Sequence, residues 1–99
     1  MTTLSRVQDL LNRATEVLPL SDEDLIYKGI AAGVAERMMA LKKAEARLED
    51  TYGTLDALEQ TIASEGVPPD DHTLYTDLLE WRAIHHELNQ VRDLFERLG

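Results

Sequence analysis

The sequence predicts an all-α fold: an antiparallel, coiled-coil-like helical hairpin with a short N-terminal helix packed on a long central helix. Two sets of apolar residues recur every seven positions, the spacing that keeps one seam of a helix against a partner helix. The chain is 43% apolar but has only 5% aromatic residues, which suits helix seams better than a sheet core. The first ladder is Tyr27, Val34, Leu41, Leu48, Leu55 and Ile62, and the second is Leu74, Trp81, Leu88 and Phe95.

A short helix is predicted over residues 3–18. Apolar residues follow a three-four alternation there, which places them on one stripe of a helix. Pro19 ends the helix, and Ser21 with Asp24 has the spacing of a capping box that starts the next one. The stripe consists of Leu4, Val7, Leu11, Ala14 and Leu18.

A long helix is predicted over residues 22–65, because no proline occurs before Pro68 and the first ladder continues without interruption. Gly53 is the expected site of a kink near residues 50–54, since a glycine inside a helix costs about 1 kcal/mol relative to alanine. The ladder stays in phase across Gly53, which favours a bend over a break. Gly29 and Gly33 provide a small-residue face on the same helix, typical of ordinary close packing.

The segment from Gly66 to Asp70 contains Pro68 and Pro69 and separates the long helix from a last helix over residues 71–98, capped by Asp70 or Asp71. Residues 1–99 therefore form a single helical domain. The first and last helices together are about as long as the central helix, which predicts that they lie end to end along its flank. A bend at Gly33 or Gly53 that closes the chain into a monomeric bundle is the alternative.

The seam is the predicted binding surface. Two layers of helices cannot enclose a core, so apolar residues beside the seam, including Met39, Leu79 and Leu94, should stay partly exposed and indicate a protein partner or a homo-oligomer. The residues assigned to partner binding or to the seam are Tyr27, Val34, Met38, Leu41, Leu48, Tyr52, Leu55, Ile62, Leu74, Trp81, Leu88 and Phe95.

No catalytic, cofactor or metal site is predicted. His85 and His86 are adjacent, so on a helix their side chains point about 100° apart and cannot share one metal ion with good geometry. The segment from His86 to Gln90 begins like a zincin helix, but Gln90 stands where the second histidine ligand must be. Serines and threonines lie at helix caps without a glycine-rich elbow. We therefore expect a protein that is not an enzyme.

Composition limits the compartment and the partners. The chain has no cysteine, no apolar run of about 20 residues and no signal-peptide pattern, so we expect a cytoplasmic protein that does not insert into membranes. A net charge of −9 disfavours nucleic acid as a partner. An acidic rod that imitates nucleic acid is an alternative, although Lys42, Lys43 and Arg47 interrupt a continuous negative stripe.

Two segments carry a family resemblance. Residues 1–11, MTTLSRVQDLL, resemble the opening of the small E-type needle co-chaperones of type III secretion systems. The second segment resembles the second hairpin helix of those proteins through Asp71, Tyr75, Ala83, Ile84, Asn89 and Val91.

The resemblance implies a non-enzymatic helical hairpin that, together with a helical-repeat chaperone, holds the needle subunit unpolymerised in the cytoplasm. This chain is longer than typical members of that family, with an extended middle of the second helix. A self-associating coiled-coil adaptor, or a structural subunit of another assembly, is the alternative function.

Overall fold

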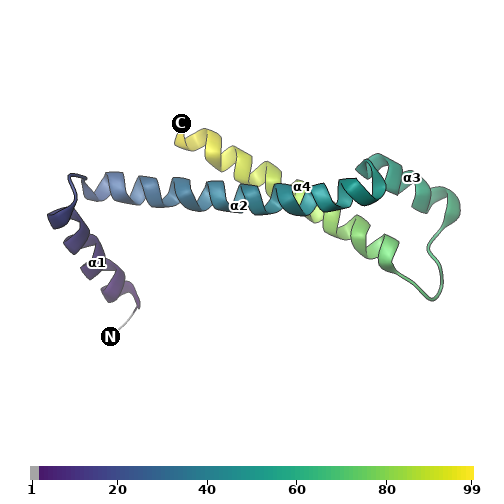
Figure 1. Cartoon of the computed structure of the whole chain (residues 1–99), viewed down its shortest axis with the longest axis horizontal. Helices are drawn as coiled ribbons and strands as arrows, with labels where there is room; N and C mark the ends of the chain where they lie inside the picture. The colour runs from purple at the N-terminus through teal and green to yellow at the C-terminus, as the bar shows by residue number, and fades with distance from the viewer. Residues whose placement is uncertain (1–2) are drawn as a thin grey trace.

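Four helices make up residues 3–99, which are the residues that this computed structural model describes. They are α1 (Thr3–Val17), α2 (Asp22–Tyr52), α3 (Leu55–Glu65) and α4 (Thr73–Leu98), and no strand occurs in this range. α4 returns antiparallel to α2 and crosses it, while α3 bridges the two at the far end (Figure 1). The prediction of an all-α helical hairpin is confirmed.

The hairpin is elongated. Its extents are 62 × 33 × 18 Å, and its radius of gyration is 20.3 Å, compared with about 13 Å for a compact domain of 100 residues. The alternative of a closed monomeric bundle is therefore wrong. We call the end that holds α3 and the loop after it the closed end, and the end that holds the α1–α2 turn the open end.

The start of α2 follows the sequence prediction. Ser21 is extended (φ −78°, ψ 166°), and its hydroxyl accepts a hydrogen bond from the backbone N–H of Asp24 at 3.1 Å. The first turn carries three carboxylates, at positions 22–24, which interact favourably with the positive end of the helix dipole. Cap and charges together explain why a helix begins here.

α1 packs against α2 at one end only. Leu11 and Ala14 are half-buried, but α1 then diverges from α2 (Figure 1). The prediction that the first and last helices lie end to end along α2 is wrong. α4 is the reason, because it runs along α2 as far as Tyr27, whose hydroxyl donates a hydrogen bond to the carbonyl of Leu98. Only the first turns of α2 are left for α1.

The predicted helix over residues 22–65 is interrupted within the predicted kink region, residues 50–54, but by a break and not by the expected bend. α2 ends at Tyr52, and Gly53 adopts φ 86° and ψ −80°, a conformation that L-residues rarely take. The Thr54 hydroxyl then accepts a hydrogen bond from Ala57 N–H at 3.0 Å and caps α3. This break turns α3 onto α4, where Leu58 is only 1% exposed. The burial of Leu58 against α4 therefore favours two helices, even though the heptad ladder stays in phase across Gly53.

α4 begins at Thr73 instead of residue 71. The carboxylate of Asp71 accepts a hydrogen bond from the backbone N–H of Thr73 at 2.9 Å, so Asp71 stays outside the helix. The Thr73 hydroxyl also donates a hydrogen bond to this carboxylate, and this bond, followed by that from the N–H, lowers the pKa of Asp71. The end of α3 at Glu65 agrees with the prediction, and Gly66 follows with φ 75°.

One apolar cluster lies where α2, α3 and α4 meet. Trp81 and Leu58, both 1% exposed, occupy its centre. Apolar residues beside the seam remain exposed as predicted, with Met39 72%, Leu79 47% and Leu94 44% exposed. The buried members of the cluster are Leu41, Leu48, Leu58, Leu78, Trp81, Ile84 and Leu88.

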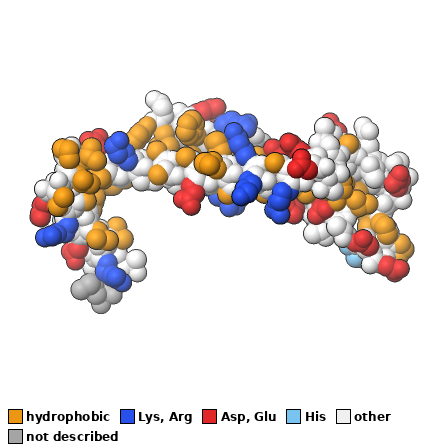
Figure 2. Space-filling view, in the orientation of Figure 1, with side chains coloured by type: hydrophobic (Ala, Val, Ile, Leu, Met, Phe, Trp, Pro, Cys, Tyr) orange, Lys and Arg blue, Asp and Glu red, His pale blue; other side chains and the backbone are white. Residues whose placement is uncertain are grey.

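Charge is distributed unevenly along the hairpin. Residues 48–81 contain nine of the chain's 19 Asp and Glu residues and none of its 10 Lys and Arg residues, so the rest of the chain is balanced. In Figure 2 the basic side chains gather over the middle of the molecule and over α1. No helix within residues 3–99 has both the length and the apolarity of a membrane span.

Candidate protein-binding surface

Most of the predicted seam is used inside the molecule. Val34, Leu41, Leu48, Trp81 and Leu88 are buried. The half-buried seam residues that pack against the apolar cluster are Met38, Tyr52, Leu55, Ile62 and Leu74. These side chains stabilise the hairpin itself, so a single chain does not present them as a free surface.

The seam opens toward the α1 end of the hairpin. Tyr27 and Phe95 belong to the predicted seam, yet they are 49% and 52% exposed. The hydrogen bond from the Tyr27 hydroxyl to Leu98 joins α2 to the last turn of α4 at this point. A hydrogen bond therefore joins the two helices at this end of the seam, while the apolar side chains of Tyr27 and Phe95 stay accessible to solvent.

α1 leaves its apolar side chains uncovered. No residue of Thr3–Val17 is buried, and Leu4, Leu10 and Val17 are each at least 70% exposed. Figure 2 shows apolar side chains over both arms of the α1–α2 turn. We define the open-end surface by its exposed apolar residues: Leu4, Val7, Leu10, Val17, Leu18, Ile26, Tyr27, Ile30, Leu94 and Phe95.

Sequence reasoning missed part of this surface. Leu10 and Val17 lie beside the predicted α1 stripe, and Ile26 and Ile30 lie beside Tyr27 on α2. A signal was present, since Leu10 and Val17 are seven residues apart and Ile26 and Ile30 are four apart, spacings that put each pair on one helix face. Together with the stripe, these residues give α1 an apolar face wider than a single seam requires.

Two ion pairs tie α4 to its neighbours. Arg37 of α2 binds Glu87 through two of its three guanidinium nitrogens, Nε and Nη2, with Nη2 2.8 Å from Oε1, and this contact lowers the pKa of Glu87. Arg82 of α4 lies 3.4 Å from Glu59 of α3. Both pairs are solvent-exposed, so they set the alignment of the helices more than they add to stability.

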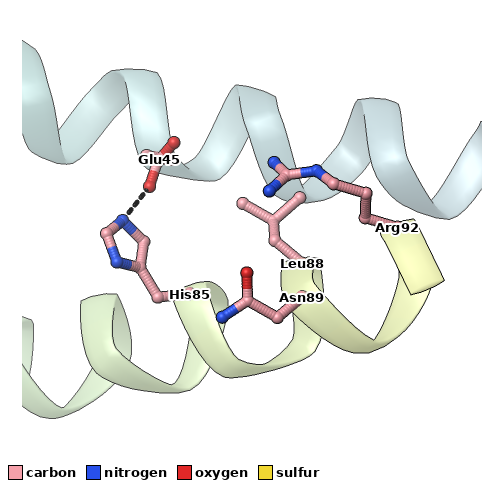
Figure 3. A pocket seen from close by; sticks show the side chains of 5 residues that line it. All are labelled: Glu45, His85, Leu88, Asn89 and Arg92. Carbon is pink, nitrogen blue, oxygen red and sulfur yellow. Dashed lines mark ion pairs between the residues drawn. The ribbon is translucent and has the colours of Figure 1, made fainter.

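The most polar contact within the core involves Glu45, which lies in a shallow hollow also lined by Leu88, Asn89 and Arg92 (Figure 3). Its Oε2 accepts a hydrogen bond from the Trp81 indole N–H at 3.2 Å and lies 2.5 Å from His85 Nε2. The edge of the Trp81 ring meets the His85 ring, with centroids 6.4 Å apart. Glu45 thereby satisfies the one polar atom of the most deeply buried aromatic residue.

The contacts of Glu45 with Trp81 and His85 hold α2 against α4 and lack the geometry of a catalytic centre. A His–carboxylate pair can act as a general base only when a nucleophile or an acidic proton lies within hydrogen-bond reach. The residues that line the hollow supply neither. Within residues 3–99, no group of three or more His, Cys, Asp or Glu side chains is placed to hold a metal ion.

A second polar contact joins α2 to α4 near Gly53. The Tyr52 hydroxyl donates a hydrogen bond to Asp77 Oδ2. This bond and, to a lesser degree, burial raise the pKa of Tyr52 to about 12. The contact stabilises the fold fully below the pKa of an unfolded tyrosine, about 10, and is lost as the pH rises through 12.

Replacing Asp77 with asparagine should return the pKa of Tyr52 toward its ordinary value, because the amide cannot stabilise the phenol as the carboxylate does. The measurement is a titration of tyrosinate ultraviolet absorbance, with Tyr52→Phe identifying the Tyr52 component. Asp56→Asn serves as the control, since it removes a nearby carboxylate that makes no contact with Tyr52. An unchanged Tyr52 titration in Asp77→Asn would contradict the assignment.

Compared with known proteins, the chain matches no protein-family model, and no curated protein or solved structure is significantly similar to it.

Proposed function

We propose that this protein is a non-enzymatic helical hairpin that binds a helical partner through the open-end surface. The observation that carries the proposal is the exposure of α1 and of the first turns of α2, where eight large apolar side chains cover both arms of one turn and Leu94 and Phe95 of α4 add two more. Soluble monomers rarely expose a contiguous apolar area of this kind without using it for binding. A partner helix laid against it would complete the packing that α4 leaves unfinished.

We further propose a co-chaperone role resembling that of the E-type needle co-chaperones. Residues 3–11 of the resembling segment lie on α1, a helix that has no buried residue. A needle subunit is kept from polymerising when its own helices are covered, and a hairpin with an unfilled apolar face can provide that cover together with a helical-repeat chaperone. The protein would act by binding, in the cytoplasm, without turnover.

The test is the composition of the complex that forms on a tagged copy in the source cell. Capture with a helical-repeat chaperone and a small needle-like subunit supports the co-chaperone proposal. Capture of this chain alone, as a homodimer or larger oligomer, supports the alternative of a self-associating coiled-coil adaptor. Either complex is then measured with substitutions that distinguish the open-end surface from the rest of the molecule.

Leu10→Glu and Val17→Glu should weaken the captured complex by at least about 100-fold, because each removes apolar contact area and places a charge in the interface. Both side chains are at least 70% exposed, and glutamate is a good helix former, so the helical signal and thermal midpoint of the free chain should stay unchanged. Leu79→Glu, at an exposed position on the opposite part of the hairpin, is the matched control. Full affinity in the two α1 variants would rule out the open-end surface as the binding site.

A further inference from the structure

The contacts between α2 and α4 fix how the two helices are aligned. Tyr27 lies level with Leu98, Glu45 with Trp81, and Tyr52 with Asp77. By this alignment the two heptad ladders face each other in two layers of the apolar cluster, Leu41 with Leu88 and Leu48 with Trp81.

A second alignment of the two helices also sets the two heptad ladders opposite each other. Because both ladders repeat every seven residues, moving α4 by one heptad toward the closed end again sets apolar residues opposite one another. Four layers would then form: Leu41 with Phe95, Leu48 with Leu88, Leu55 with Trp81, and Ile62 with Leu74. This alignment requires Leu55 and Ile62 to continue the line of α2, so that residues 22–65 form one helix.

Two residues between α2 and α3 must leave their present conformations for these helices to join: Thr54, which is extended (φ −128°, ψ 159°), and Gly53. The Gly53 φ of 86° is open to glycine and strained for other residues. A Cβ atom at this position would meet nothing within 4 Å, so the strain of this φ, and not a steric clash, disfavours alanine there. Leu48, Leu55 and Ile62 keep their heptad phase across it.

The two arrangements exchange different interactions. The bent form buries Leu58 and Val34, uses the Thr54 cap, and makes the polar contacts of α4 with Glu45, Tyr52 and Arg37. The straight form would restore the backbone hydrogen bonds interrupted at Gly53 and add two apolar layers. Glycine lowers the stability of the straight helix by an amount typical for its low helix propensity.

We propose that Gly53 is a hinge that switches the hairpin between two registers. In the bent register, which the structure shows, α3 folds onto α4. In the straight register, residues 22–65 form one helix and α4 slides by seven residues, about 10 Å at 1.5 Å per residue. The straight register is the minor state of this equilibrium, which ligands or substitutions can raise. Sliding uncovers Val34 and extends the open-end surface along α2.

Spin labels measure the slide directly, because the chain has no cysteine of its own. Lys28→Cys and His86→Cys place labels at exposed positions on α2 and α4, and double electron–electron resonance reports their separation. This separation should be about 10 Å longer in the straight register. A pair within α2, Lys28→Cys with Lys43→Cys, should give the same distance in both registers.

Gly53→Ala and Thr54→Ala favour the straight register. Alanine at position 53 is strained in the bent form and stabilises the continuous helix, a shift on the order of 30- to 100-fold. Alanine at position 54 removes the cap of α3, a shift of about fivefold. The double variant should therefore have mostly the longer 28–86 distance.

Gly66→Ala is the matched control. Gly66 also has a positive φ, but Pro68 follows it and no helix can continue, so this variant should keep the short distance. The proposal is overturned if Thr54→Ala and the double variant both keep the wild-type 28–86 distance. It is also overturned if Gly66→Ala lengthens the distance as much as Gly53→Ala.

Discussion

Replacing Leu88 with aspartate is expected to unfold the hairpin at neutral pH. Leu88 is 5% exposed and packs in the apolar cluster between α2 and α4. The substitution removes most of a buried leucine, which costs about 2–5 kcal/mol, and adds a carboxylate at a buried position beside Glu45. A combined loss of about 5 kcal/mol or more would equal the whole stability of many small domains.

Far-ultraviolet circular dichroism with urea titration measures this loss. Leu94→Asp is the control on the same helix, because Leu94 is 44% exposed and a charge there remains hydrated. Acidification should partly restore the fold of Leu88→Asp, since burial raises the pKa of a carboxyl group and the neutral form is tolerated below that pKa. A stable Leu88→Asp hairpin at neutral pH would show that the core is not where the structure places it. Loss of partner binding in this variant would reflect unfolding and would not identify an interface.

Replacing Trp81 with alanine should lower the free energy of unfolding by about 3–5 kcal/mol. Trp81 is 1% exposed, lies among residues from α2, α3 and α4, and donates its indole N–H to Glu45. The substitution leaves a large cavity and removes the hydrogen-bond donor from a half-buried carboxylate. The cavity and the lost hydrogen bond both lower the free energy of unfolding.

The comparison uses Tyr75→Ala on the same helix. Tyr75 is 49% exposed, so its truncation should change the free energy of unfolding by no more than about 0.5 kcal/mol. Urea denaturation followed by circular dichroism suits both variants, because Trp81 is the only tryptophan and its fluorescence is lost in one of them. Equal losses in the two variants would mean that Trp81 is not the centre of the core.

The hairpin, its loop and the start of α2 are predictable from local sequence. Heptad spacing specifies which residues face a partner helix, Ser21 caps α2 through the expected hydrogen bond, and Gly66 with the prolines after it ends α3. Each of these features depends on residues close together in the chain, so no knowledge of distant contacts is needed.

The break at Gly53 and the extent of the open-end surface depend on distant contacts. A ladder in phase across Gly53 is compatible with one helix or two, and the burial of Leu58 against α4 decides between them. Similarly, the sequence identifies Tyr27 and Phe95 as seam residues. Only the crossing of α2 and α4 determines that both stay half exposed while Val34 is covered.

The confinement of nine unbalanced carboxylates to residues 48–81 gives the rod a permanent electric dipole along its length. At an ionic strength near 0.1 M, the Debye length of about 10 Å is much shorter than the 62 Å rod. An approaching macromolecule therefore senses one end at a time: two copies repel each other when their closed ends meet, and their nearly neutral open ends do not. Repulsion between closed ends thus disfavours one orientation of two meeting copies and leaves their apolar open ends free to meet.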